Sequence, residues 1–185
     1  FVETPQSWAE KRGVGPTPLT PGMFGYSLLR MADNRPFFNA LMDDMLAFGV
    51  PLEGLHTETG PGVYEAAIAF SEALEQADRA ILFKTGAREI GKRHGIMPSF
   101  MAKWNQQYPG CSGHLHQSLS DGKKNLFYDA KSPRAMSKLF ESYLAGQVAC
   151  LMEFAPMFWP TINSYKRLVD GFWAPVKPTW GLDNR

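Results

Sequence analysis

The chain has 185 residues, 44% of them hydrophobic and 20% charged, which suffices for one domain with a hydrophobic core or for a large part of a bigger one. Its 19 basic and 18 acidic residues give a formal net charge of +1, so no general field attracts nucleic acid or an anionic membrane. We find no apolar stretch long enough to span a membrane and no signal-peptide pattern, and two cysteines fit a reducing compartment. A cytoplasmic protein is therefore expected.

The first half of the chain is predicted to contain a loop, a helix, two strands and a second helix. Residues 1–25, rich in Pro and Gly, predict a loop. Apolar residues at helical spacing predict a helix from Asn34 to a stop near Gly49. Residues 51–58 and 63–70 predict two strands around a turn at 59–62, and a helix is expected from Ser71 to about His94, its apolar positions including Leu74, Ala77, Ile81 and Ile90.

The second half is predicted to mix short strands with one long helix. Strands are expected at 96–103 and 114–119, with a turn at Asp121-Gly122. Ser132-Pro133 predicts the start of a helix reaching about Leu151, and the remainder predicts a loop followed by strand-like pieces. Because strands and helices do not alternate regularly, the pattern indicates an α+β fold with a largely antiparallel sheet.

Two glutamates flank the predicted turn at 59–62. On a strand, alternation puts His56 and Glu58 on one face and Glu53 on the other, and the returning strand would bring Glu65 beside Glu58. Neighbouring carboxylates repel each other unless a cation lies between them, and hard divalent ions take such oxygen ligands. The pattern indicates either a divalent-metal site or a hairpin with solvated acids.

Two further motifs carry groups suited to phosphate chemistry. On a strand, His114, His116 and Ser118 would point the same way, as a metal ligand and phosphate contacts would, although packed or exposed histidines give the same pattern. Arg167, in the sequence Asn-Ser-Tyr-Lys-Arg-Leu, and Arg185 are either bidentate ligands for carboxylate or phosphate, or solvated charges.

In this order the three motifs resemble the catalytic domain of the glutamine synthetase family, from about residue 34 to Arg185. The resemblance implies a catalytic domain with a curved antiparallel sheet flanked by helices. It implies that residues 1–185 form part of that domain, with an N-terminal β-domain and the C-terminal part of the catalytic domain missing. It also implies a homo-oligomeric ring, a decamer or dodecamer, with active sites between adjacent subunits.

The resemblance further implies a ligase that phosphorylates a glutamate-like acid with ATP, using Mg²⁺ or Mn²⁺, before an amine displaces the phosphate. It assigns metal binding to Glu58, Glu65 and His114, and nucleotide binding to Glu53, His116 and Ser118. It assigns the acid substrate to Gly110 and Arg167, with Arg185 near the phosphoryl group.

Two positions depart from the glutamine-forming members of the family. Pro109 stands where they have Asn, and Trp173 stands where they have a Glu that binds and deprotonates ammonium. An indole accepts no proton, but it packs against alkyl groups or cations. The sequence therefore favours a ligase that joins the γ-carboxylate of glutamate to a larger amine bound by Trp173. The alternatives are an ordinary glutamine synthetase that uses ammonium, a catalytically silent family member like the lens lengsins, and an unrelated structural α+β domain.

Overall fold

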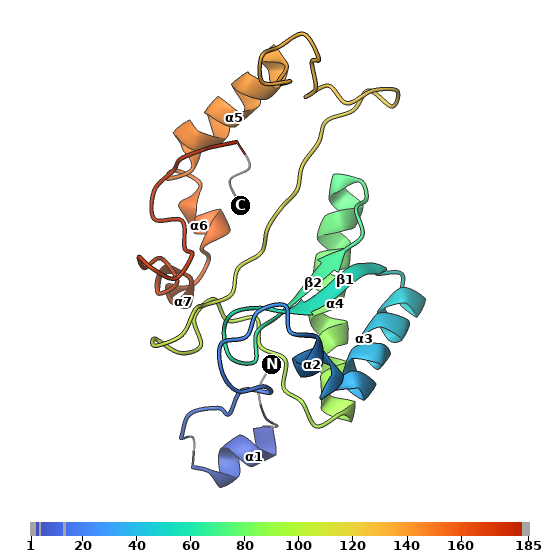
Figure 1. Ribbon diagram of the computed structural model, residues 1–185, viewed down its shortest axis with the longest axis vertical. Helices are drawn as coiled ribbons and strands as arrows, with labels where there is room; N and C mark the ends of the chain where they lie inside the picture. The colour runs from blue at the N-terminus through green and yellow to red at the C-terminus, as the bar shows by residue number, and fades with distance from the viewer. Residues whose placement is uncertain (1–2, 4, 13, 183–185) are drawn as a thin grey trace. The chain divides into compact units, whose positions relative to one another are not determined.

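The computed structural model describes residue 3, residues 5–12 and residues 14–182 (Figure 1). The chain divides into two compact units. The first contains residues up to 101 together with 107–109, and the second contains residues 102–106 together with those from 110 onward.

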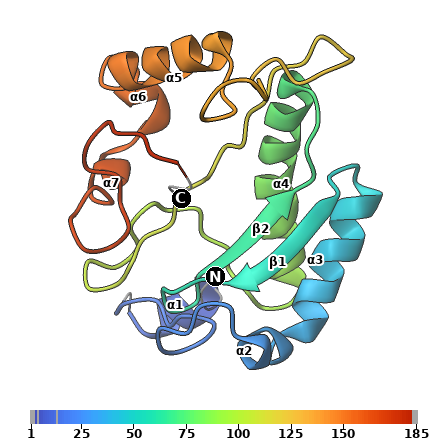
Figure 2. The same cartoon turned by 45° about the horizontal axis from the view of Figure 1, so that its top comes forward.

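The first unit is a β-hairpin packed against two helices. Its elements are α1 (Pro5–Glu10), α2 (Leu28–Ala32), α3 (Arg35–Ala47), β1 (Leu52–Thr57), β2 (Tyr64–Ile68) and α4 (Ala73–Arg93). Strands β1 and β2 pair in antiparallel orientation, and Figure 2 shows α3 and α4 beside this hairpin. Tyr64 and Leu55 of the hairpin pack against the core residues of α3, which include Phe37, Leu41 and Met45.

Helix α3 confirms the predicted helix and its stop. Phe37, Leu41 and Met45 recur every four residues, so they share one face, and this face is buried. The helix ends where Gly49 adopts a φ of +84°. The N–H of Gly49 donates to Leu46 O at 3.1 Å and that of Val50 to Met45 O at 2.8 Å, which is the Schellman arrangement. Gly49 stops the helix because a left-handed residue costs glycine little.

Helix α4 differs from the prediction at its start and in its buried face. It begins after Glu72, and the Ser71 hydroxyl bonds the side chain of Gln76. Leu74 and Ile81 are exposed, whereas Ala87, Ile90 and Gly91 are buried. A Cβ at Gly86 would lie 2.6 Å from Met45 Sδ. The buried stripe is therefore set by the close approach of α3 and not by the largest apolar residues.

The predicted loop over residues 1–25 is wrong at its start but holds for the described residues after α1, and the predicted strand at 96–103 is wrong. Residues 5–10 form the short helix α1, and no strand is assigned within 96–103. The predicted strand at 114–119 is also wrong, because in the part that the structure describes no neighbouring strand satisfies its backbone groups. The Asp121-Gly122 turn is confirmed. Gly122 has a φ of +86°, and Ser120 and Asn125 on either side of the turn form an isolated antiparallel β-bridge.

The second unit is built on α5 (Lys138–Cys150), α6 (Ala155–Phe158) and α7 (Ile162–Tyr165). Helix α5 starts six residues later than Ser132, because Ala135 adopts a φ of +54° and Met136 bridges to Tyr128. Ser137 caps the helix, its hydroxyl accepting from Phe140 N at 3.1 Å. The strand-like pieces predicted after residue 168 are wrong, since no strand is assigned there among the described residues.

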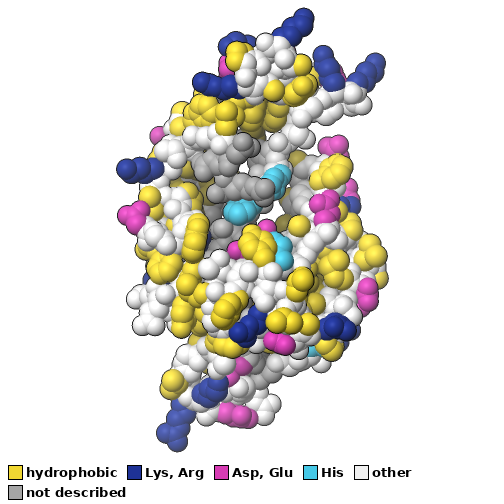
Figure 3. Space-filling view, in the orientation of Figure 1, with side chains coloured by type: hydrophobic (Ala, Val, Ile, Leu, Met, Phe, Trp, Pro, Cys, Tyr) yellow, Lys and Arg dark blue, Asp and Glu magenta, His cyan; other side chains and the backbone are white. Residues whose placement is uncertain are grey.

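The α+β fold class is confirmed, with the β1–β2 hairpin as the sheet of the described residues. No helix in the described ranges is long and apolar enough to cross a bilayer. Hydrophobic side chains are exposed at many places, as the face in Figure 3 illustrates. In the second unit they include Leu139, Tyr143, Met152, Phe154, Met157 and Phe158.

Candidate functional site

The β1–β2 hairpin brings an imidazole and two carboxylates together. His56 pairs with Glu65 across the strands, and Glu58 follows at the end of β1. His56 Nδ1 lies 3.3 Å from Glu58 Oε1, and His56 Nε2 lies 3.9 Å from Glu65 Oε1. The metal-ligating atoms of all three side chains lie within 4.8 Å of one another. The expectation that Glu65 returns beside Glu58 is therefore met.

The turn and the flanking loop hold this cluster in place. Glu58 N donates to Val63 O at 2.8 Å, Val63 N donates to Gly60 O at 3.0 Å, and Gly62 turns the chain with a φ of +66°. The Tyr26 ring stacks on His56 with centroids 4.8 Å apart, and Tyr26 N donates to Thr57 O at 2.7 Å. The imidazole is thus covered on one ring face, and the strand beside it is held through Thr57.

The spacing of these three groups suits a divalent cation. Two ligands on one ion can be at most twice the metal–ligand distance apart, which is about 4–5 Å for bonds of about 2.0–2.5 Å. The three donors meet this condition, and two carboxylates match the charge of such an ion. The donor set on this hairpin therefore fits a divalent metal.

Sequence reasoning gave no role to His56, although strand alternation had already placed it on the face of Glu58. Glu53 is exposed and lies where the register shifts between Leu52 and Gly54, and it is not part of the cluster. His114 belongs to the second unit, so its approach to the two carboxylates remains a prediction.

Arg167 is the buried cation of the second unit. It follows α7, which Thr161 caps through a bond from Ser164 N, and it is only 8% exposed. Nη1 donates to Phe172 O at 2.9 Å and Nη2 donates to Trp173 O at 3.3 Å. Nε is buried and has no partner among the described residues. Burial lowers the pKa of Arg167, since the charged form loses solvation.

Gly110 lies directly against Arg167. A Cβ at this position would lie 2.1 Å from Ala102 O, 2.3 Å from Arg167 Cδ and 3.0 Å from its Nε. The loop approaches this closely because Cys111 N donates to Ala102 O at 2.8 Å. The structure thus brings together Gly110, Arg167 and the backbone of Trp173, three residues that the sequence assigned to substrate binding.

Lys103 and Asn163 support this site and were missed from the sequence. Asn163 Oδ1 accepts from Lys103 N at 2.9 Å, and its Nδ2 donates to Lys103 O at 2.8 Å. Lys103 is 5% exposed, with Nζ 4.2 Å from the centroid of the Phe172 ring. Burial, and then the charge of Arg167, lower the pKa of Lys103. Sixty positions separate the two residues, so no local pattern could have paired them.

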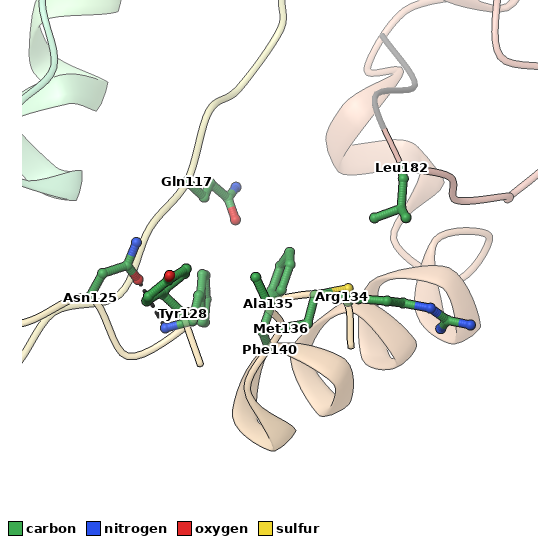
Figure 4. Close-up of a pocket in the computed structure, with 9 residues that line it drawn as sticks. Gln117, Asn125, Tyr128, Arg134, Ala135, Met136, Phe140 and Leu182 are labelled. Atoms are coloured by element: carbon green, nitrogen blue, oxygen red, sulfur yellow. Dashed lines mark hydrogen bonds between the residues drawn. The ribbon is translucent and has the colours of Figure 1, made fainter. Parts of the chain in front are cut away.

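The remaining predicted residues are less constrained. His114, His116 and Ser118 are exposed on a segment without assigned strand structure, and Arg185 lies outside the described residues. A pocket of about 340 Å³ lies between helix α5 and Gln117, the residue between His116 and Ser118 in the sequence (Figure 4). Its walls include Phe127, Met136 and Phe140, and none of the predicted site residues lines it.

Comparison with known proteins identifies the family. The sequence profile described as "Glutamine synthetase, catalytic domain" matches residues 9–185. The chain therefore belongs to the glutamine synthetase family, as the order of its motifs predicted.

Individual relatives carry names of two kinds. The chain is 59% identical over 187 residues to "Type-1 glutamine synthetase 2" of Dictyostelium discoideum. The matched region covers 100% of the chain and 36% of that protein. It is 39% identical over 161 residues to "Glutamate--isopropylamine ligase" of Pseudomonas sp, covering 86% of the chain and 35% of that protein. The chain thus spans about a third of the length of these relatives.

A solved structure supports the same fold. The chain resembles "GmaS/ADP complex-Conformation 1" with a TM-score of 0.74 and 25% sequence identity, over 85% of the chain and 36% of that structure. The predicted fold class, a partial catalytic domain of the glutamine synthetase type, is confirmed.

Proposed function

We propose that this chain is part of an ATP-dependent ligase that joins the γ-carboxylate of glutamate, or of a similar acid, to an alkyl amine. The observation that carries this proposal is the convergence of His56, Glu58 and Glu65 on one hairpin in a chain of the glutamine synthetase family. Two carboxylates at this spacing repel each other unless a cation lies between them, which favours a metal-dependent enzyme over a structural protein.

The proposed reaction has two steps. A carboxylate oxygen of the acid attacks the γ-phosphorus of ATP, and ADP leaves. The amine nitrogen then attacks the acyl carbon. The bond between this carbon and the phosphate oxygen breaks, phosphate leaves with the two electrons of that bond, and the nitrogen loses a proton to give the amide. Both steps gather negative charge in one place, so positioning and electrostatic stabilisation supply the catalysis.

The residues singled out from the sequence, together with His56, take distinct roles in this proposal. Glu58 and Glu65, together with His56 and His114, would hold Mg²⁺ or Mn²⁺, which neutralises phosphoryl charge when bound. Arg167 and Gly110 would receive the acid, and Trp173 would receive the amine. Glu53, His116 and Ser118 would contact ATP, and Arg185 would lie near the phosphoryl group.

The experiment that tests the proposal is phosphate release by the full-length protein. Release from ATP should require the acid, the amine and Mg²⁺ together, and omission of any one should reduce it to background. Release that needs neither acid nor amine would contradict a ligase. Absence of release across a panel of acids and amines would favour a catalytically silent, lengsin-like protein.

The choice of amine is a separate prediction that rests on Trp173. Its ring is exposed, the residue being 74% accessible, so it can contact a substrate. Each CH₂ of an amine fully buried on the indole contributes about 0.8 kcal/mol, and a cation–π contact contributes about 0.5–2 kcal/mol. We expect kcat/KM for ethylamine or putrescine to exceed that for ammonium by about tenfold or more, since about 1.4 kcal/mol is tenfold.

A Trp173→Glu variant provides the control for this prediction, because it restores the acid found in ammonium-using relatives. Its preference should shift toward ammonium. An unmodified protein that prefers ammonium would contradict the role of Trp173. It would favour an ordinary glutamine synthetase, the second candidate, which the 59% identity to a protein named glutamine synthetase also supports.

We further infer that the whole protein has an N-terminal β-domain, completes the catalytic domain with additional chain, and works in the cytoplasm as a homo-oligomeric ring. The exposed apolar side chains on α5 and α6 support contacts with further protein, since such surfaces are usually covered. A decamer or dodecamer is the expected size, which sedimentation of the full-length protein would measure.

A further inference from the structure

Arg167 offers its hydrogen-bond donors to two different groups. A carboxylate binds arginine through a pair of neighbouring N–H groups, either the two terminal nitrogens or Nε and one terminal nitrogen. The pair that includes Nε is shielded, because Nε is buried and lies close to Gly110. The two terminal nitrogens already donate to Phe172 O and Trp173 O. An incoming carboxylate must therefore compete with these two carbonyls.

The same bonds hold Trp173 in an unfavourable conformation. Trp173 has a φ of +55°, in the left-handed region that side chains other than Gly, Asn and Asp seldom adopt. Such residues persist where surrounding contacts hold them. One contact that does so here is the bond from Arg167 Nη2 to the Trp173 carbonyl, while the ring itself is largely exposed.

We propose that Arg167 is a positioning residue that couples the acid to the amine site: the acid carboxylate takes the terminal N–H groups from Phe172 O and Trp173 O, and Trp173 moves in response. This inference rests on the proposed function. Each hydrogen bond is worth about fivefold in an equilibrium constant. Displacing both carbonyls therefore lowers the apparent affinity for the acid by at most about 25-fold relative to an Arg167 with unoccupied donors, because relief of the conformation of Trp173 offsets part of the loss. The amine site reaches its working form only when the acid is bound.

The test is tryptophan fluorescence of the full-length protein during titration with glutamate, with Mg²⁺ and a non-hydrolysable ATP analogue present and amine absent. Calorimetry on the same sample reports acid binding independently. We expect the emission to change with the same saturation as the heat. In a Trp173→Phe variant the heat should persist and the fluorescence change should be lost.

An Arg167→Lys variant gives a second readout that needs no acid. The lysine ammonium cannot hold both carbonyls in the planar geometry of a guanidinium. Its spectrum without acid should therefore already resemble that of the acid-saturated unmodified protein. Lys166→Gln is the matched control, since Lys166 is the exposed neighbour, and its spectrum should equal that of the unmodified protein.

Heat of binding without any change at Trp173 would overturn the coupling and leave the proposed function intact. The absence of both heat and fluorescence change would overturn both. An Arg167→Lys spectrum identical to that of the unmodified protein without acid would also overturn the coupling.

Discussion

Replacing Gly110 with Ala is expected to reduce kcat/KM for the acid about 100-fold. The new Cβ would lie 2.1 Å from a backbone carbonyl and 2.3 Å from Arg167 Cδ, so either the loop or the arginine must move. A backbone carbonyl yields less easily than the end of a side chain, and a displacement of about 1 Å in a substrate-binding group can cost about 100-fold. Steady-state kinetics at fixed ATP and amine would measure the loss, with the larger part in KM for the acid.

Gly113→Ala is the matched control for this substitution. It lies in the same loop, and a Cβ there would have no neighbour within 4 Å. Its kcat/KM should stay within about twofold of the unmodified protein, as for most surface changes. Equal losses in the two variants would mean that the loop, and not its contact with Arg167, accounts for the effect.

Replacing Glu65 with Gln is expected to reduce activity by more than the roughly 10–100-fold typical of groups that only support metal ligands. The amide keeps the size of the side chain but loses the charge, and its neutral carbonyl oxygen is a weaker ligand beside His56 and Glu58. Calorimetric titration with Mn²⁺ should show a parallel loss of affinity. The effect on folding should be small because Glu65 is partly exposed.

Glu89→Gln is the control for this second prediction. Glu89 is an exposed acid on α4 outside the cluster, and its loss changes the net charge equally. Mn²⁺ affinity should be unchanged. If Glu65→Gln bound Mn²⁺ as tightly as Glu89→Gln, the hairpin would be a pair of solvated acids.

Local patterns predicted the elements whose ends are fixed by their own residues. Helix α3 ends at Gly49 because a glycine there accepts the left-handed conformation, and the β1–β2 turn follows from its Gly-Pro-Gly sequence. The approach of Glu65 to Glu58 followed from the predicted turn, which returns the chain, together with strand alternation. These features depend on neighbours in the chain, which a sequence displays directly.

Features that depend on distant partners were not predicted. The backbone of Lys103 is held by Asn163, sixty positions away. Lys103 is also buried, and no pattern in the adjacent sequence indicates this burial. The alternating segment at 114–119 has the pattern of a strand, but a strand also requires a partner, and the described residues supply none. The start of α5 was misplaced because Ser132-Pro133 is a capping signal that the turn at Ala135 overrides.

Isotope transfer is the most direct measurement of the central claim, the activation of a carboxylate by ATP. The full-length protein would be supplied with ATP, Mg²⁺, an alkyl amine and glutamate labelled with ¹⁸O in its γ-carboxylate, and the released phosphate would be analysed by mass spectrometry. Attack of the carboxylate on ATP, followed by displacement by the amine, predicts phosphate that carries one ¹⁸O and an amide product in equal amount. Phosphate free of ¹⁸O would mean that water had cleaved the ATP, and it would contradict the ligase.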